Sequence, residues 1–205
     1  MYRYAPQNDV KELAEWCLFI LHEMQDEMRD FFTFDIRLIG SGEKRLVTQN
    51  EEECFDLDYN LILQRDKQGL LDNPKKIKDL FVARFNKVLE KHVKGYFHAC
   101  DSSSVITMKI IHDNRLTFSF DVAIIVEGDD GFFYRLTNDK NSGRYIWNRV
   151  KNSGNYLEKY QQIKKGGYFP QFKERYLELK NMHLNHRDDI KSFSIFLETL
   201  NEFYQ

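Results

Sequence analysis

The sequence has few cysteines and no long apolar run, and each shortage excludes a class of protein. The cysteines, Cys17, Cys54 and Cys100, lie far apart and form no Cys-x-x-Cys pair, which argues against a disulfide framework or a structural zinc site. No apolar run approaches the roughly 20 residues of a membrane-spanning helix. The first residues show no signal-peptide pattern. We therefore expect a cytoplasmic protein with no membrane partner.

The chain also lacks an excess of positive charge. Lysine and arginine number 30 against 32 aspartate and glutamate, for a net charge of -2. No overall basic field is therefore available to attract nucleic acid. Nucleotide binding is still compatible with this balance, because a divalent cation can supply positive charge locally. Hydrophobic residues make up 42% and charged residues 30%, which is typical of a globular domain.

Hydrophobic patterns along the chain predict an α+β fold with a sheet core and a small helical lobe. Asp9 is the expected N-cap of the first helix, and residues 113–114 the expected hairpin turn. We divide the chain into a core, residues 1–144, and a C-terminal helical lobe, residues 145–205. Helices are expected at residues 10–32, 74–92, 145–150, 156–164, 170–183 and 189–204, and strands at residues 34–39, 54–63, 96–100, 105–112, 116–127 and 132–136.

Acidic residues stand out in two of the expected strands. Asp56 and Asp58 are two residues apart, so both carboxylates project from one face, roughly 7 Å apart at the backbone. In the later strand Phe118, Phe120 and the following alternate residues form the apolar face, which places Asp121 on the opposite face. An aspartate inside such an apolar strand is costly to bury without a partner. An Asp-x-Asp pair alone is usually solvated surface, but Asp121 makes a shared site the better interpretation.

Metal-assisted phosphoryl transfer needs this combination of groups. Magnesium prefers hard oxygen ligands such as carboxylates and phosphates. The turn at Gly40 and Ser41 offers backbone N–H groups and a hydroxyl to a phosphate. We therefore predict that Asp56, Asp58 and Asp121 are catalytic and bind Mg²⁺, with Mn²⁺ as the alternative metal, and that Gly40 and Ser41 bind nucleotide.

Gly40-Ser41, then Asp56 and Asp58, then the lone strand Asp121 resemble the DNA polymerase beta superfamily of nucleotidyltransferases. The motif style is most similar to the branch with cyclic GMP-AMP synthase and the oligoadenylate synthases, over residues 34–127. The resemblance implies a mixed, mostly antiparallel sheet flanked by helices. It implies that Ser41 contacts the terminal phosphates, that Asp56 and Asp58 hold both metals, and that Asp121 ligates the catalytic metal and helps activate the acceptor hydroxyl.

The resemblance implies transfer of a nucleoside monophosphate from a nucleoside triphosphate to an acceptor, with release of pyrophosphate. The acceptor is open among a small molecule, RNA and protein, and the oligomeric state is open as well. An alternative is a catalytically silent module that senses a nucleotide or a partner on the same fold. A third interpretation is a toxin–antitoxin or mobile-element enzyme that modifies RNA or protein. The stretch after Asp121 is shorter than in typical cyclic-nucleotide synthases.

Overall fold

The computed structural model describes residues 1–51, 53–94, 96–112, 115–139, 142–150, 156–185 and 190–204. Contacts divide the chain into two compact units. The sheet unit comprises residues 6–45 and 54–150, and the helical unit comprises residues 1–5, 46–53 and 151–205. The division at residue 145 stays a prediction about domains. The contact units differ from this prediction in two ways. Residues 1–5 and 46–53 belong to the helical unit, and residues 145–150 belong to the sheet unit.

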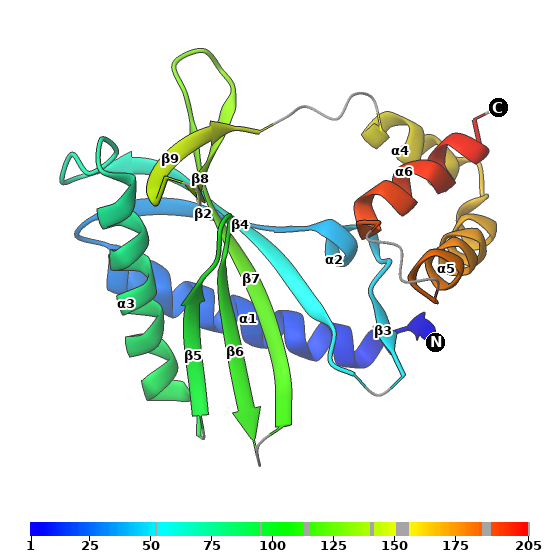
Figure 1. Ribbon diagram of the computed structural model, residues 1–205, viewed down its shortest axis with the longest axis horizontal. Coiled ribbons are helices and arrows are strands. Elements are labelled where there is room, and N and C mark those ends of the chain that lie inside the picture. The colour runs from blue at the N-terminus through cyan, green and yellow to red at the C-terminus, as the bar shows by residue number, and fades with distance from the viewer. Residues whose placement is uncertain are drawn as a thin grey trace. The chain divides into compact units, whose positions relative to one another are not determined.

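The sheet unit is a seven-stranded sheet with helices. Its strand order is β2-β4-β7-β6-β5, and β8 pairs with both β7 and β9. The pair β4–β7 is parallel and the other pairs are antiparallel, so the predicted α+β class and the mostly antiparallel sheet are confirmed (Figure 1). The elements are α1 (Gln7–Met28), β2 (Phe32–Ile39), α2 (Gly40–Lys44), β4 (Asp56–Asp66), α3 (Pro74–His92), β5 (Tyr96–Asp101), β6 (Ile106–His112), β7 (Arg115–Glu127), β8 (Phe133–Asp139) and β9 (Arg144–Arg149).

Aromatic side chains pack the two long helices against one face of this sheet. Trp16 of α1 lies edge-on to Phe120 of β7, with ring centroids 6.1 Å apart. Phe81 of α3 contacts Phe34 of β2, with centroids 5.8 Å apart. Burying each such ring stabilises the fold by about 1.5–3 kcal/mol. Because side chains alternate along a strand, residues next to Phe120 project from the other face, which these two helices do not cover.

The helix starts show where local sequence decides and where it does not. At α3, Asn73 accepts a hydrogen bond from the Lys76 backbone N–H at 3.1 Å, and Pro74 occupies the first turn. At α1 the predicted Asp9 cap is wrong, since Pro6 is the N-cap and Asp9 lies in the first turn. Asp9 there still interacts favourably with the helix dipole.

Residues 145–150 form strand β9 and its end, so the predicted helix there is wrong. Tyr145 and Trp147 are half-buried, while Ile146 and Asn148 between them are exposed. This alternation is the period of a strand, and six residues are too few to show a helical period clearly. Trp147 donates from Nε1 to the Leu71 carbonyl at 2.9 Å, so it belongs to the sheet unit. The predicted turn at residues 113–114 lies outside the described residues.

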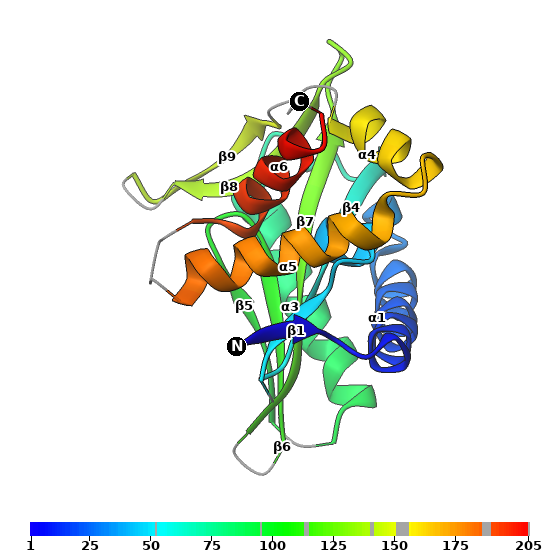
Figure 2. The same ribbon diagram turned by 90° about the vertical axis from the view of Figure 1, so that its right-hand side faces the viewer.

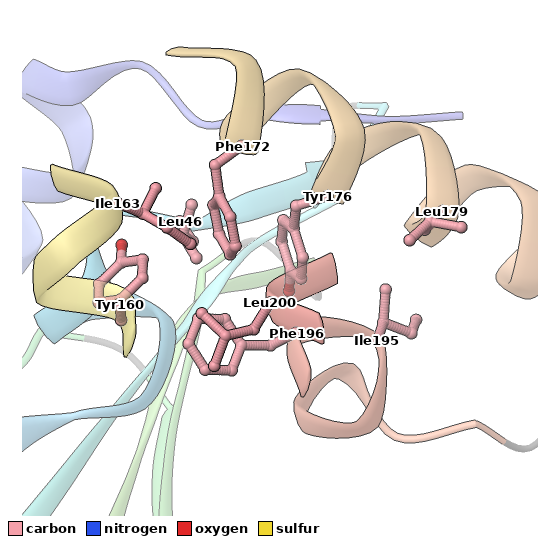
Figure 3. Close-up of a cluster of buried hydrophobic side chains, with 9 residues drawn as sticks. All are labelled: Leu46, Tyr160, Ile163, Phe172, Tyr176, Leu179, Ile195, Phe196 and Leu200. Atoms are coloured by element: carbon pink, nitrogen blue, oxygen red, sulfur yellow. The ribbon is translucent and has the colours of Figure 1, made fainter. Parts of the chain in front are cut away.

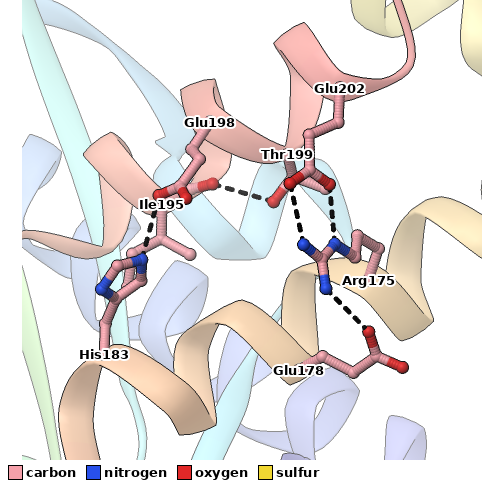
Figure 4. Close-up of polar contacts among 7 residues, drawn as sticks. All are labelled: Arg175, Glu178, His183, Ile195, Glu198, Thr199 and Glu202. Atoms are coloured by element: carbon pink, nitrogen blue, oxygen red, sulfur yellow. Dashed lines mark hydrogen bonds and ion pairs between the residues drawn. The ribbon is translucent and has the colours of Figure 1, made fainter. Parts of the chain in front are cut away.

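The helical unit has a core of its own. Figure 2 shows β1 beside α5. Arg175 of α5 pairs with Glu178 and Glu202, and His183 with Glu198 (Figure 4). None of the described helices combines the length and the apolar character of a bilayer crossing. The elements of the unit are β1 (Tyr2–Tyr4), β3 (Thr48–Asn50), α4 (Tyr156–Lys165), α5 (Phe169–Asn185) and α6 (Ser192–Glu202). The buried core consists of Leu46, Tyr160, Ile163, Phe172, Tyr176, Leu179, Ile195, Phe196 and Leu200 (Figure 3).

Lys180 is a buried cation inside the helical unit, and it predicts a pH-dependent stability. Its Nζ donates to Thr48 Oγ1 at 2.6 Å and lies 4.9 Å from the centre of the Tyr2 ring. Burial lowers the pKa of the ammonium from 10.5 to about 8. Between these two values the unfolded chain binds the proton that the folded chain has lost, so stability rises with pH across this window. Below the pKa of the folded chain, Lys180 is charged in both states, and burial of this charge lowers the free energy of unfolding by its full amount.

We expect Lys180→Met to raise the free energy of unfolding by about 2 kcal/mol at pH 7, because relief of charge burial exceeds one lost hydrogen bond. The gain should shrink toward pH 10.5, because the folded lysine loses its proton near pH 8 and the charge is then no longer buried. Urea denaturation followed by circular dichroism at both pH values measures it, with the exposed Lys165→Met as the matched control. A gain of the same size at both pH values would contradict the account.

Candidate active site

The parallel pairing of β4 with β7 brings the three predicted aspartates together. In this register Asp58 lies opposite Asp121, and Asp56 lies opposite Ser119. All four residues project from the sheet face opposite that of Phe120, because side chains alternate along each strand. The strands β4 and β7 run side by side in both views (Figures 1 and 2). The structure therefore assembles one acidic cluster from two segments about 60 residues apart in the chain.

The cluster brings like charges together, with Asp58 and Asp121 half-buried and Asp56 exposed. Burial raises the pKa of Asp58 to about 6, helped by the negative charges of Asp121 and Asp56 and opposed by Arg135 and Lys44. Burial also raises the pKa of Asp121, against the hydrogen bond from a neighbouring threonine. A bound cation would stabilise the charged form of carboxylates held this way. Carboxyl groups with strongly shifted pKa values are typical of functional sites.

Hydroxyl groups from neighbouring strands hold two of the carboxylates. Thr107 of β6 lies opposite Asp121, and its Oγ1 donates to Asp121 Oδ1 at 2.6 Å. Ser119 donates from its hydroxyl to Asp56 Oδ1. Neither residue was predicted as part of the site. Ser119 could have been found, since it precedes Asp121 by two residues and shares its face, whereas Thr107 depends on the strand register.

Gly40 approaches the cluster from the end of β2. Ile39, the last residue of that strand, lies opposite Asp58. Gly40 has φ +66°, and a Cβ atom added there would lie 2.7 Å from Asp58 Oδ2. Glycine is therefore needed twice, for its backbone conformation and for the close approach to a carboxylate. The predicted Gly40-Ser41 turn is the first turn of the short helix α2, where buried Lys44 donates back to the Gly40 carbonyl at 3.2 Å.

Two further polar residues lie on the same sheet face and were not predicted as site residues. Asn60 follows Asp58 by two residues, and Arg135 of β8 lies opposite Ile125 of β7. Burial lowers the pKa of the Arg135 guanidinium, and the charge of Asp58 opposes this. Within the described residues, Arg135 Nε and Asn60 Oδ1 are buried atoms without a hydrogen-bond partner. Buried polar atoms of this kind are uncommon and call for an explanation.

The cluster fits a magnesium or manganese ion in its chemistry but is not arranged around one. Carboxylate oxygens are the ligands that these hard cations prefer. Yet no group of three or more His, Cys, Asp and Glu side chains is placed to hold a metal ion in the part of the chain that the structure describes. One oxygen of Asp56 and one of Asp121 point to hydroxyls instead. An ion shared by the cluster would therefore have to reach the second oxygens of these two carboxylates.

Structural comparison places the chain in the nucleotidyltransferase fold. Escherichia coli MS115-1 CdnC with ATP aligns at TM-score 0.59 and 14% identity, over 97% of this chain and 60% of that one. Vibrio cholerae DncV cyclic AMP-GMP synthase with a linear intermediate aligns at TM-score 0.56 and 15% identity, over 83% of this chain and 44% of that one. Bradyrhizobium diazoefficiens CD-NTase CdnG with GTP aligns at TM-score 0.50 and 13% identity, over 76% of this chain and 42% of that one.

These structures are CD-NTases, relatives of cyclic GMP-AMP synthase within the polymerase beta superfamily, so the predicted resemblance is confirmed for the fold. The chain spans about half the length of the structures it matches, from 42% of CdnG to 60% of CdnC. No protein-family model and no curated protein sequence matches the chain.

Proposed function

We propose that the chain is a metal-dependent nucleotidyltransferase that moves a nucleoside monophosphate from a nucleoside triphosphate to an acceptor and releases pyrophosphate. The observation that carries this proposal is the register that sets Asp58 opposite Asp121 with Asp56 on the same face. Three carboxylates in one cluster, two of them half-buried, suit a site that binds cations and phosphates. The fold shared with CdnC and DncV, which were solved with ATP and a nucleotide intermediate, supports it.

The residues have distinct roles in the proposed transfer. An acceptor oxygen forms a bond to the α-phosphorus, the bond from that phosphorus to the bridging oxygen breaks, and pyrophosphate leaves. Asp121 orients the acceptor hydroxyl and accepts its proton. Mg²⁺ or Mn²⁺, held by Asp56, Asp58 and Asp121, would neutralise phosphate charge as it develops. Gly40 and Ser41 would contact the terminal phosphates of the nucleoside triphosphate.

Arg135 and Asn60 support a polar substrate group beside the carboxylates. Arg135 Nε offers an N–H donor and Asn60 Oδ1 offers an acceptor, and both are buried and unpaired within the described residues. Substrate groups that reach these atoms could accept a hydrogen bond from Arg135 Nε and donate one to Asn60 Oδ1. The cost of leaving each unpaired is about 1–3 kcal/mol, which such a substrate would recover on binding.

A nucleotide-sensing module without turnover is the second candidate. The absence of a ready three-ligand metal group among the described side chains favours it. Both candidates predict triphosphate binding. Only the enzyme predicts that the α-phosphate moves to another molecule.

Transfer from α-³²P-labelled triphosphates with Mg²⁺ separates the two candidates and sorts the acceptors. Small molecules, RNA and protein are supplied together and then fractionated. We expect label to enter one of these fractions. Label confined to small molecules would reject the enzyme that modifies RNA or protein, and bound triphosphate with no transferred label would favour the sensing module.

A further inference from the structure

Ser119 is a buried hydroxyl with a partner in the acidic cluster. It lies on β7 directly opposite Asp56 of β4, and it is only 5% exposed. Its hydroxyl donates to Asp56 Oδ1. Directly opposed residues on paired strands have closely spaced side chains, so the two backbones determine this contact. The bond occupies one oxygen of the carboxylate, and Asp56 Oδ2 accepts no hydrogen bond from the described residues.

Thr107 makes the equivalent contact on the other side of β7. It lies on β6 opposite Asp121, and its Oγ1 donates to Asp121 Oδ1 at 2.6 Å. The β-branched side chain of threonine has few rotamers, which favours one direction for the hydroxyl. Two of the three carboxylates therefore have one oxygen held by a hydroxyl from the neighbouring strand, while Asp58 is bounded by Gly40 instead.

We propose that Ser119 and Thr107 are positioning residues, each of which holds one carboxylate of the cluster so that its second oxygen is available to cation and substrate. The inference rests on the proposed function and extends it to residues outside the aspartate motif. Groups that orient ligating side chains in this way typically change metal affinity or activity by 10–100-fold when removed. A carboxylate freed from its hydroxyl would sample more rotamers and would lose part of its preorganisation.

A purely structural role for the hydroxyls predicts something different. If they only supplied hydrogen bonds to the two carboxylates, removing them would lower stability and leave cation affinity unchanged. A positioning role predicts weaker cation binding, a lower kcat with a nearly unchanged KM for the triphosphate, and recovery in variants that keep the hydroxyl.

Manganese titration followed by electron paramagnetic resonance tests the inference on the purified full chain. Wild type is compared with Ser119→Ala, Thr107→Val, the hydroxyl-keeping Thr107→Ser and Ser119→Thr, and the exposed control Thr33→Val on β2. We expect the first two variants to bind Mn²⁺ 10–100-fold more weakly and the others to bind within a few-fold of wild type. Circular dichroism verifies folding, and Ser119→Ala tests the idea alone if Thr107→Val does not fold.

The outcomes separate this inference from the proposed function. Wild-type affinity in both Ser119→Ala and Thr107→Val overturns the positioning role and leaves the enzyme proposal standing. The same holds if Thr107→Ser is as weak as Thr107→Val. If wild-type protein binds no Mn²⁺ and transfers no label, both proposals fail together.

Discussion

Asp121→Asn is expected to lower nucleotidyl transfer by about 10³-fold or more, since a lost carboxylate removes several kcal/mol of stabilisation from the charged transition state. The substitution keeps the size of the side chain and removes its charge. It also removes the proton acceptor that the proposed reaction assigns to this position. Initial rates of labelled product formation at saturating Mg²⁺ and triphosphate measure the effect.

The fold should survive this change, because Asp121 is only half-buried and asparagine has nearly the same size. Replacing one of three neighbouring, mutually repelling carboxylates relieves repulsion, so the thermal midpoint should hold or rise. Asp35→Asn is the matched control, since Asp35 lies opposite Ile62 on an exposed part of β2 and pairs with Gln64. Comparable losses in the two variants would show that charge on this sheet, rather than the cluster, supports turnover.

Gly40→Ala is expected to lower transfer by about 10²-fold, because displacement of a catalytic group by an ångström can cost that much. The added methyl would lie 2.7 Å from Asp58 Oδ2, so the carboxylate must move. The backbone at φ +66° also penalises alanine, by about 1–2 kcal/mol. These two effects have to be separated.

Gly69→Ala separates them. Gly69 has φ +64°, so alanine meets nearly the same backbone penalty there, but nothing lies within 4 Å of the added Cβ. Both variants should therefore lose similar stability in thermal denaturation, while only Gly40→Ala loses transfer activity. Full activity in folded Gly40→Ala would mean that Asp58 does not need its observed position.

Alternation along single strands allowed the faces of the site to be predicted. Asp56 and Asp58 share a face because the side-chain period is two, and Asp121 opposes Phe120 for the same reason. Leu57, Tyr59 and Phe120 are fully buried, as this alternation requires. Predictions of this kind need only a few consecutive residues.

Contacts between distant strands could not be predicted in the same way. Asp58 meets Asp121 through a parallel pairing whose register depends on the whole sheet, and Thr107 reaches Asp121 through a second pairing. The lack of room for a side chain at Gly40 is likewise a property of the fold, because the nearest atom belongs to Asp58 on another strand. Strand β9 was mistaken for a helix because its identity comes from pairing with β8.

Pyrophosphate release is the most direct measure of whether the three carboxylates carry out nucleotidyl transfer. Purified wild-type and Asp56→Ala chains are incubated with Mg²⁺, all four ribonucleoside triphosphates, RNA and protein acceptors. The account predicts steady release by wild type and almost none by Asp56→Ala, with superimposable circular dichroism spectra. Equal release by the two chains, or no release by the wild-type chain, would contradict it.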